Sequence, residues 1–492
     1  MPSPLSTLRK ALWHFRHGGT EQVRLWWSRQ ESRRAKPSRL TNTGTDTGTH
    51  TGSGGPKPVV VRNSDLARDG FPFPQQRPEP EFEPRRDHVL YLLHNALPYH
   101  SGGYATRTHG LLTELNRMGW DVDGVTRLGY PYDMPKMADL PDLPAHEMVG
   151  EVDYHHLLTG RQIEKKNPMF DYTERYMDAL LPLARKERPA ILHGASNHWN
   201  GLAAIKTART LGIRSVYEVR GLWEVTRGSR DPEWGRSDQY RYIARMEADT
   251  ARGADRVLAI TGALKAELID RGVDEETITL VPNGVDTERF VPIPRDQGLA
   301  AQLGVTDKTV IGYVGTIADY EGLSLLLTAA RELQRTREDF HVLIVGDGAV
   351  LEELQAQVEA DGLTDVVTFA GRVPHEEVER YYSIIDITPF PRLPLPVCEM
   401  VSPLKPFEAM AMGKAVVASD VAALAEIVTP GMNGLLHEKG SAESLTEQLG
   451  TLLDQPELAG RLGGQSRQWV VEHRDWRQLA QRIAAVYEEL VR

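Results

Sequence analysis

The sequence predicts an α/β protein with two doubly wound parallel sheets, and two observations support this. Short apolar runs typical of buried strands alternate with segments of helical periodicity, and the alternation occurs in two sets separated by the polar connector 292–308. The expected strands are 88–94, 190–196, 215–220, 256–261 and 278–282 in the first set, and 310–316, 341–348, 366–372, 385–390 and 415–419 in the second. Ligands of such sheets bind at the carboxyl ends of the strands. The space between the two sheets is therefore the expected ligand site.

Composition and hydrophobic pattern divide the 492 residues into five expected parts. Thr/Gly repeats and a Pro-rich stretch near the N-terminus lack the apolar surface that folding requires. The last segment has apolar residues at helical spacing. The parts are a basic amphipathic N-terminal segment (1–40), a disordered linker (41–87), two α/β domains (88–290 and 291–470) and a C-terminal helix (471–492).

The net charge of −11 hides an asymmetry that bears on partners and location. Residues 1–39 carry nine Lys or Arg and two acids, a net of +7, interleaved with Trp13, Trp26 and Trp27. Such a segment suits a helix on an anionic membrane surface, and equally a basic helix packed on its own protein or a solvated tail. The single cysteine, Cys398, excludes an intramolecular disulfide, and no apolar run is long enough to span a membrane. We expect a cytoplasmic protein, peripheral at the inner face of the membrane if residues 1–39 bind there, without a nucleic-acid partner.

Glycines follow several expected strands at the edge where a ligand would bind. Gly102 and Gly103 precede a helix, where backbone N–H groups can approach an anion. Gly315 and Gly346 come directly after strands of the second set. Each position alone fits an ordinary turn, but together they suggest a phosphate-bearing ligand.

Several segments from residue 88 onward, in their order and spacing, resemble a family 4 retaining glycosyltransferase of GT-B architecture. They are the "SGG" loop, "VPNGVDTERF" (281–290), "VGDG", "GRVPHEEVERYYSIIDI" (371–387), "FEAMAMGKAVVASDVAALAEIV" (407–428) and the closing "YEEL".

The resemblance implies two Rossmann-like domains facing each other across a cleft, with the last helix crossing back to the first domain. A nucleotide-sugar donor, a UDP- or GDP-sugar, would bind mainly to residues 291–470. A glycan or lipid-linked acceptor would bind mainly to residues 88–290, in the synthesis of cell-surface polysaccharide or glycolipid. It also implies transfer with retention of configuration, and neither metal nor cofactor. The lone Asp-x-Asp, Asp121 to Asp123, follows a helix end, where solvated charges are expected.

Relatives of this kind usually carry two glutamates with seven residues between them, and this chain departs from that spacing. Glu408 matches the second glutamate, whose implied role is to accept hydrogen bonds from the ribose hydroxyls. The first glutamate would fall at Met400, whereas Glu399 lies one residue earlier. Either Glu399 reaches the sugar hydroxyls through a different loop path, or that contact has been lost and Glu399 is a surface acid.

The cations that usually hold the donor diphosphate are also absent from their usual places. Thr316 stands where arginine is common, and Glu321 stands where lysine is usual. The leaving nucleoside diphosphate needs charge stabilisation, so a substitute is expected. Lys405, three residues before Glu408, is the leading candidate, and the alternative is that it is a solvated lysine. Arg372 and Arg392 are the next candidates.

In the first domain, the family's usual second histidine is replaced by Ala195. His193 remains, either as a hydrogen-bonding group near the reacting sugar or as a core histidine, and His198 or Asn197 could fill the gap. Arg220 ends a strand, where it would bind carbohydrate or diphosphate, or form an inter-domain ion pair.

Two other classes share this cleft and are carried as alternatives. They are a GT-B-fold epimerase or phosphorylase, and a nucleotide-sugar-binding scaffold in which the changes at Thr316 and Glu321 mark lost activity.

Overall fold

The computed structural model describes residues 61–134, 137, 139–160 and 164–492. The expected basic segment (1–40) and the Thr/Gly repeats that begin the expected linker lie outside the described residues. No helix among those described is long and apolar enough to cross a membrane.

The first sheet has eight strands in the order β3-β4-β2-β1-β5-β6-β7-β8. All neighbours are parallel except β3 and β4, which pair antiparallel at one edge. The central strands β1 and β5 are almost entirely buried, as expected for a parallel sheet covered on both faces. The strands are β1 (Arg85–Leu93), β2 (Asp121–Thr126), β3 (His146–Val149), β4 (Val152–His156), β5 (Pro189–Ala195), β6 (Arg214–Val219), β7 (Arg256–Ala259) and β8 (Ile278–Leu280).

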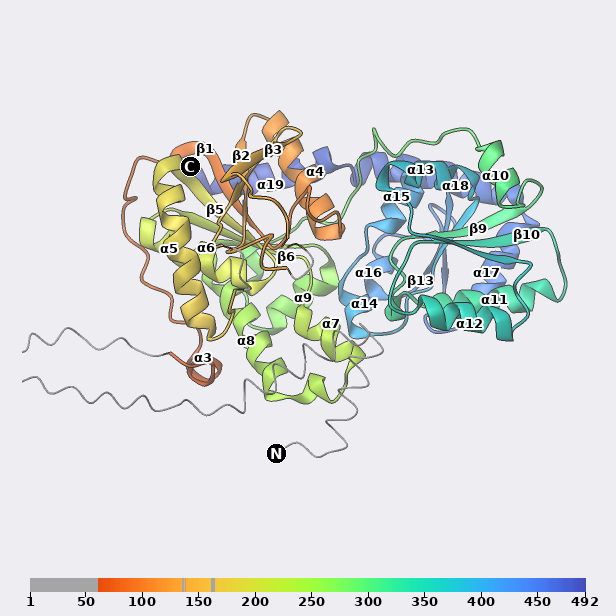
Figure 1. Cartoon of the computed structure of the whole chain (residues 1–492), viewed down its shortest axis with the longest axis horizontal. Coiled ribbons are helices and arrows are strands. Elements are labelled where there is room, and N and C mark those ends of the chain that lie inside the picture. The colour runs from red at the N-terminus through yellow and green to blue at the C-terminus, as the bar shows by residue number, and fades with distance from the viewer. Residues whose placement is uncertain (1–60, 135–136, 138, 161–163) are drawn as a thin grey trace, which may run out of the picture. The chain divides into compact units, whose positions relative to one another are not determined.

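Helices cover both faces of this sheet (Figure 1). On one face, α4 and the C-terminal helix α19 share a hydrophobic cluster that includes Leu111 and Ile483. On the other face, α5 and α6 pack with Leu90 and Leu92 of β1. The helices are α4 (Gly103–Arg117), α5 (Met169–Glu187), α6 (His198–Leu211), α7 (Trp223–Arg230), α8 (Asp238–Gly253), α9 (Gly262–Asp270) and α19 (Trp476–Val491).

The second sheet has six parallel strands in the order β11-β10-β9-β12-β13-β14. They are β9 (Thr309–Val314), β10 (Phe340–Val345), β11 (Val367–Gly371), β12 (Ile387–Phe390), β13 (Ala415–Ser419) and β14 (Leu435–His437). The helices of this half are α10 (Gln297–Gln302), α11 (Leu323–Gln334), α12 (Leu351–Ala360), α13 (Val378–Ile384), α14 (Pro396–Met400), α15 (Lys405–Ala411), α16 (Ala422–Ala425), α17 (Ala442–Asp454) and α18 (Pro456–His473).

The predicted class, an α/β fold with two doubly wound parallel sheets, is confirmed, and each of the ten expected strands overlaps a strand of the structure. Four strands were not expected: β2, β3, β4 and β14. Each of the first three is interrupted by acids or histidines and has no apolar run, and β14 has only three residues. Asp121 and Asp123 follow the end of α4, as expected, but lie within β2. The Asp121 side chain is 43% exposed, whereas that of Asp123 is 16% exposed, so the expectation of a solvated charge is wrong for Asp123.

The end of the expected linker also differs from the prediction. Residues 63–69 form helix α3 (Asn63–Asp69), and Leu66 and Phe71 are buried against Tyr242 and Met246 of α8. The backbone N–H of Phe71 donates to the buried Asp249 carboxylate at 2.9 Å. The apolar residues of this stretch are few, but Leu66 and Phe71 pack against the first domain and hold the stretch in place.

Candidate active site

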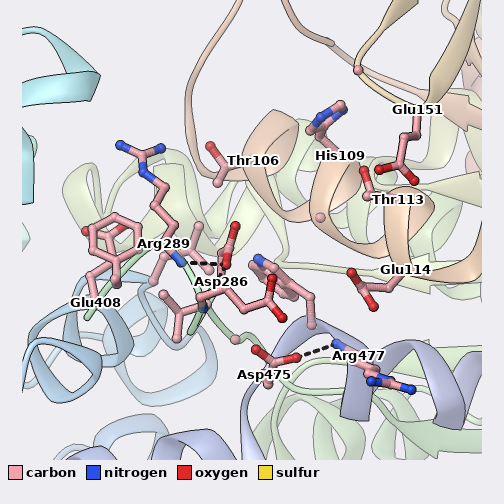
Figure 2. Close-up of a pocket in the computed structure, with 18 of the residues that line it drawn as sticks. Thr106, His109, Thr113, Glu114, Glu151, Asp286, Arg289, Glu408, Asp475 and Arg477 are labelled. Carbon is pink, nitrogen blue, oxygen red and sulfur yellow. Dashed lines mark hydrogen bonds between the residues drawn. The ribbon is translucent and has the colours of Figure 1, made fainter. Parts of the chain in front are cut away.

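Two adjoining cavities contain residues from both halves of the described chain. The first, of about 690 Å³, lies among α4, the segment 284–290, the start of α15 and the start of α19 (Figure 2). The second, of about 330 Å³, lies among the first turn of α4, α7 and the segment 397–404. Leu404 lines both cavities, so they form neighbouring parts of one candidate site.

The N-terminus of α4 lies between these cavities. Gly102 is the N-cap in extended conformation without a capping side chain, Gly103 and Tyr104 line the second cavity, and Thr106 lines the first. The first N–H groups of a helix have no partner within the helix, and the dipole of a 15-residue helix favours an anion there. The site that was predicted at Gly102 and Gly103 is therefore positioned to bind phosphate.

A buried charge network holds α4 in place behind this site. Glu218 accepts hydrogen bonds from Tyr91 Oη at 2.6 Å, Arg107 Nη2 at 2.6 Å and Arg220 Nε at 2.6 Å. Arg220 also donates to the Thr108 hydroxyl at 2.7 Å, and Arg107 donates to Asn283 Oδ1 at 3.1 Å. Although Arg220 touches the second cavity, its guanidinium is committed to this network. Of the two expectations, the ion pair describes Arg220 better than direct ligand binding. Its partner, Glu218, lies in the same domain, so the pair is not the inter-domain one that was expected.

Glu408 lines the first cavity from the first turn of α15. Burial raises the pKa of its carboxyl to about 7, while the charges of Lys405 and Arg289 oppose that rise. A carboxylate that becomes desolvated in a cavity is suited to accept hydrogen bonds from hydroxyl groups. Of the acids predicted at the site, Glu408 is the one that the structure places in a cavity.

Two residues next to Glu408 were not predicted. Arg289 bonds through Nε to Glu379 Oε1 at 2.5 Å and through Nη1 to His375 Nε2 at 2.6 Å. Arg289, His375 and Glu408 lie in the wall of the first cavity, with Glu408 and Arg289 at one end and Glu114 and Glu151 at the other (Figure 2). Both Arg289 and His375 belong to segments that carried the family resemblance, so the signal was present but not read residue by residue.

Lys405 does not line either cavity. Its ammonium donates to Tyr313 Oη at 2.6 Å and lies 3.3 Å from Glu321 Oε1. Arg392 Nε lies 3.5 Å from the other oxygen of Glu321, and both side chains are about 4% exposed. Lys405 therefore pairs with the buried Glu321 carboxylate in the protein interior. This corrects the expectation that Lys405 contacts the diphosphate. With Arg392, the cluster keeps a net charge of +1 beside the second cavity.

Gly315, Thr316 and Gly346 form the support for this cluster. The φ of Gly315 is 147° and that of Gly346 is 144°, and a Cβ on either would collide with the Lys405 side chain or with the Gly315 carbonyl. The Thr316 carbonyl accepts hydrogen bonds from Tyr313 Oη at 2.9 Å and from Lys405 at 3.3 Å. These residues pack the ends of β9 and β10 together and line neither of the two cavities, so their direct contact with a donor stays a prediction.

Glu399 and Arg372 are also directed away from the cavities. Glu399, on α14, accepts from Lys439 Nζ at 2.7 Å and from the backbone N–H of Ala422 at 2.7 Å. It therefore caps α16 and does not face a donor sugar. Arg372 is exposed on the loop after β11 and lines neither cavity.

The two predicted histidines are buried in the first domain. Burial lowers the pKa of His193 to about 3, and its Nδ1 lies 2.6 Å from Tyr487 Oη of α19. His193 is thus a neutral core histidine that joins β5 to α19. His198 pairs through Nδ1 with the buried Glu247 at 2.8 Å, and the backbone N–H of His198 donates to the same oxygen at 3.1 Å. Spacing could not reveal either direction, because it does not specify where a side chain points.

Two family models match this chain. "Glycosyl transferases group 1" matches residues 298–469, and "Glycosyl transferase 4-like domain" matches residues 102–284.

Several curated proteins are similar to this chain. A GDP-mannose-dependent alpha-(1-6)-phosphatidylinositol monomannoside mannosyltransferase of Mycolicibacterium smegmatis is 30% identical over 42% of this chain and 54% of its own length. The lipopolysaccharide core biosynthesis mannosyltransferase LpsB of Rhizobium meliloti is 31% identical over 49% of this chain and 67% of its own. An MMP alpha-(1->4)-mannosyltransferase of Mycolicibacterium hassiacum is 26% identical over 80% and 96%.

Solved structures share the fold. The sucrose-phosphate synthase of Thermosynechococcus elongatus superposes with a TM-score of 0.68 at 23% identity, over 82% of this chain and 98% of that one. HepE of Anabaena in complex with UDP has a TM-score of 0.60 at 18% identity, over 82% and 100%.

Fold and site together define a GT-B enzyme of the nucleotide-sugar-dependent class. The chain belongs to the family 4 type of glycosyltransferase, and the alternatives of an epimerase, a phosphorylase or an inactive scaffold are not favoured.

The charge state of Glu408 predicts a pH dependence of nucleotide binding. Because the pKa of the free carboxyl is about 7, only about a tenth of the molecules are ionised at pH 6 and about nine tenths at pH 8. If ribose hydroxyls donate to the carboxylate, the affinity for a nucleoside diphosphate rises about tenfold between pH 6 and pH 8 through this group alone. Isothermal titration of wild type and Glu408→Gln measures it. Binding to the Glu408→Gln variant should still depend on pH through the ligand's own phosphate, but without the roughly tenfold rise that comes from Glu408. The variant should also lose about 1–3 kcal/mol of binding free energy at pH 8. Identical pH profiles for the two proteins would exclude Glu408 from the binding step.

The Lys405–Glu321 pair predicts a stability coupling. Lys405→Met leaves the buried Glu321 with Arg392 alone, so the free energy of unfolding falls by up to about 3–5 kcal/mol. The loss in the double variant with Glu321→Gln should be smaller than the sum of the two single losses, because the Lys405–Glu321 interaction can be lost only once. Urea denaturation of both single variants and the double variant measures the coupling. A Lys405→Met variant of wild-type stability that has lost only turnover would instead assign Lys405 to the diphosphate.

Proposed function

We propose that this enzyme transfers a hexosyl group, mannosyl or glucosyl, from a UDP- or GDP-sugar to a glycan or lipid-linked acceptor in the synthesis of a cell-envelope glycolipid or polysaccharide. The observation that carries the proposal is the position of Glu408 in a cavity next to the N-terminus of α4. A carboxylate for ribose hydroxyls and a helix N-terminus for phosphate are the two contacts that a nucleotide sugar requires. The similar mannosyltransferases, which include a phosphatidylinositol monomannoside enzyme and a lipopolysaccharide core enzyme, support the acceptor class.

The residues of the cleft act by holding the donor in position and by stabilising negative charge. Glu408 holds the nucleoside, and the first N–H groups of α4 receive the diphosphate. Negative charge grows on the diphosphate as the glycosidic bond breaks, so donors fixed at the α4 terminus stabilise the transition state more than the bound donor. The net positive cluster of Arg392, Lys405 and Glu321 adds to this field from behind the second cavity. We propose that transfer retains configuration by displacement on one face, in which the leaving diphosphate helps to accept the acceptor proton.

A panel of donors tests the reaction. We expect turnover with GDP-mannose or UDP-glucose in the presence of a phosphoinositol glycolipid or oligomannoside acceptor, with release of the nucleoside diphosphate and an α-linked product by NMR. Glu408→Ala should lower kcat/KM by at least about tenfold, because a charged hydrogen-bond partner contributes about 1.5–3 kcal/mol. Binding of every nucleotide without transfer or hydrolysis of any donor would contradict the proposal. A β-linked product would contradict retention alone.

We further propose that residues 1–39 hold the enzyme at the inner face of an anionic membrane, where a lipid-linked acceptor is available. The support is the net charge of +7 interleaved with tryptophans. Full-length protein should co-sediment with vesicles rich in the anionic lipid phosphatidylglycerol. It should detach from them at high salt, because salt screens the attraction between exposed charges. A variant that starts at residue 61 should remain in the supernatant. Equal sedimentation of the full-length protein with neutral and anionic vesicles would contradict this role.

A further inference from the structure

A group of acids and histidines lies on the first sheet, on the face opposite α4. Asp123 of β2 neighbours Asp153 of β4, since the parallel register pairs Gly124 with Tyr154. Side chains alternate between the faces of a strand. Tyr154 packs in the cluster of α4 and α19, so Asp153 and His155 point to the other face, which α5 and α6 cover. The group is therefore separated by the sheet from α4 and the residues of that helix that line the first cavity.

The three side chains Asp123, Asp153 and His155 have the spacing of a metal site. One ligand atom from each lies within 4.8 Å of the other two. The His155 Nε2 to Asp123 Oδ2 distance is 3.4 Å. Two ligands of a tetrahedral zinc ion, each about 2.0–2.2 Å from the metal, lie about 3.4 Å apart. An ion could therefore bind both atoms with little movement of either.

His88 of β1 gives a second, independent indication. Its side chain is 1% exposed, and its Nδ1 lies 3.0 Å from the backbone carbonyl oxygen of Asp121 and 3.1 Å from Asp121 Oδ2, so Nδ1 donates to Asp121. The other nitrogen, Nε2, is buried without a hydrogen-bond partner and lies 3.9 Å from Asp123 Oδ2. An unprotonated Nε2 would point its lone pair at a carboxylate, and a protonated one would be a buried donor without an acceptor at bonding distance. A cation between the two groups removes the conflict, and a histidine oriented by an Nδ1–H···O=C bond is the usual form of a metal ligand.

The burial of the group suits an ion that enters from solvent. The side chains of Asp123, Asp153 and His155 are 16%, 24% and 12% exposed. Asp121 is already paired with Arg85, so it is not counted as a ligand. His146 of β3 lies 3.1 Å from Asp153 Oδ2 and can orient that carboxylate.

We propose that Asp123, Asp153 and His155 bind one divalent transition-metal ion, with the Nε2 of His88 directed at the same site from β1. Mixed carboxylate and imidazole ligands suit Zn²⁺ among the common ions, with Mn²⁺ as the nearest competitor. The ion would join the strands β1, β2 and β4 on the face of the sheet opposite α4. Its role is structural, because none of these ligands lines either cavity of the candidate active site.

Zinc binding by the tag-free, full-length protein tests this site. After dialysis against a chelator, we expect uptake of one equivalent of Zn²⁺ in competition with a chromogenic chelator, and a rise in the thermal unfolding midpoint, because an ion that binds the folded state stabilises it. His155→Gln and Asp153→Asn should each reduce Zn²⁺ affinity by at least tenfold and remove the thermal shift. His341→Gln is the matched control, since His341 lies on β10 of the other sheet, bonded to Thr368 at 2.9 Å.

The outcomes separate the site from a network of ion pairs alone. Absence of saturable uptake by the wild-type protein would overturn the proposal without reference to any variant. Uptake that His155→Gln and Asp153→Asn leave at the wild-type level, or that His341→Gln abolishes, would also overturn it. Glycosyl transfer by the wild-type protein should be the same with and without zinc, so a failure here is distinct from a failure of the proposed function.

Discussion

The buried carboxylate of Glu218 is the interaction on which the geometry of the site depends. Burial opposes its ionisation, but the charges of Arg220 and Arg107 outweigh that effect and hold the pKa of the carboxyl well below its usual range. Arg107 continues to Asn283 Oδ1, and Asn283 Nδ2 donates to the Ser402 carbonyl at 2.7 Å. Glu218 thereby ties α4, whose N-terminus would receive the diphosphate, to the segment between the sheets and to the loop before α15. Removing one partner of such a buried set costs about 3–5 kcal/mol, so we expect the network to tolerate little change.

A second buried charge cluster joins Glu321, Lys405 and Arg392. Glu321 stands where a lysine is usual, and Lys405 with Arg392 surrounds it from α15 and from the loop after β12. Burial lowers the pKa of the Lys405 ammonium while Glu321 opposes that effect, which fits a pair whose members stabilise each other. The cations beside the second cavity thus lie at Arg392 and, behind it, at Lys405. The field that a leaving diphosphate meets comes from the α4 terminus and from this net positive cluster.

How far the sequence predicted the molecule depended on the kind of signal. Apolar runs predicted the central strands because buried parallel strands require them, while β2 and β4 were not predicted because acids in β2 and an acid and histidines in β4 interrupt any apolar run. In the site, Glu408 was chosen because it belongs to a motif at a helix start, and it lines the first cavity, while its contact with a donor ribose stays a prediction. For Lys405 the expected position was wrong, and for Glu399 and His193 two alternatives stayed open, because spacing gives a residue's position along the chain and not the direction of its side chain.

The central claim is that one ligand spans Glu408 and the N-terminus of α4. The most direct measurement is a crystal structure of the enzyme with a bound nucleoside diphosphate, UDP or GDP. The account predicts ribose hydroxyls at hydrogen-bond distance from the Glu408 carboxylate and the diphosphate at the N–H groups of Gly103 and Tyr104. A nucleotide bound with its ribose away from Glu408, or with its diphosphate remote from α4, would contradict it.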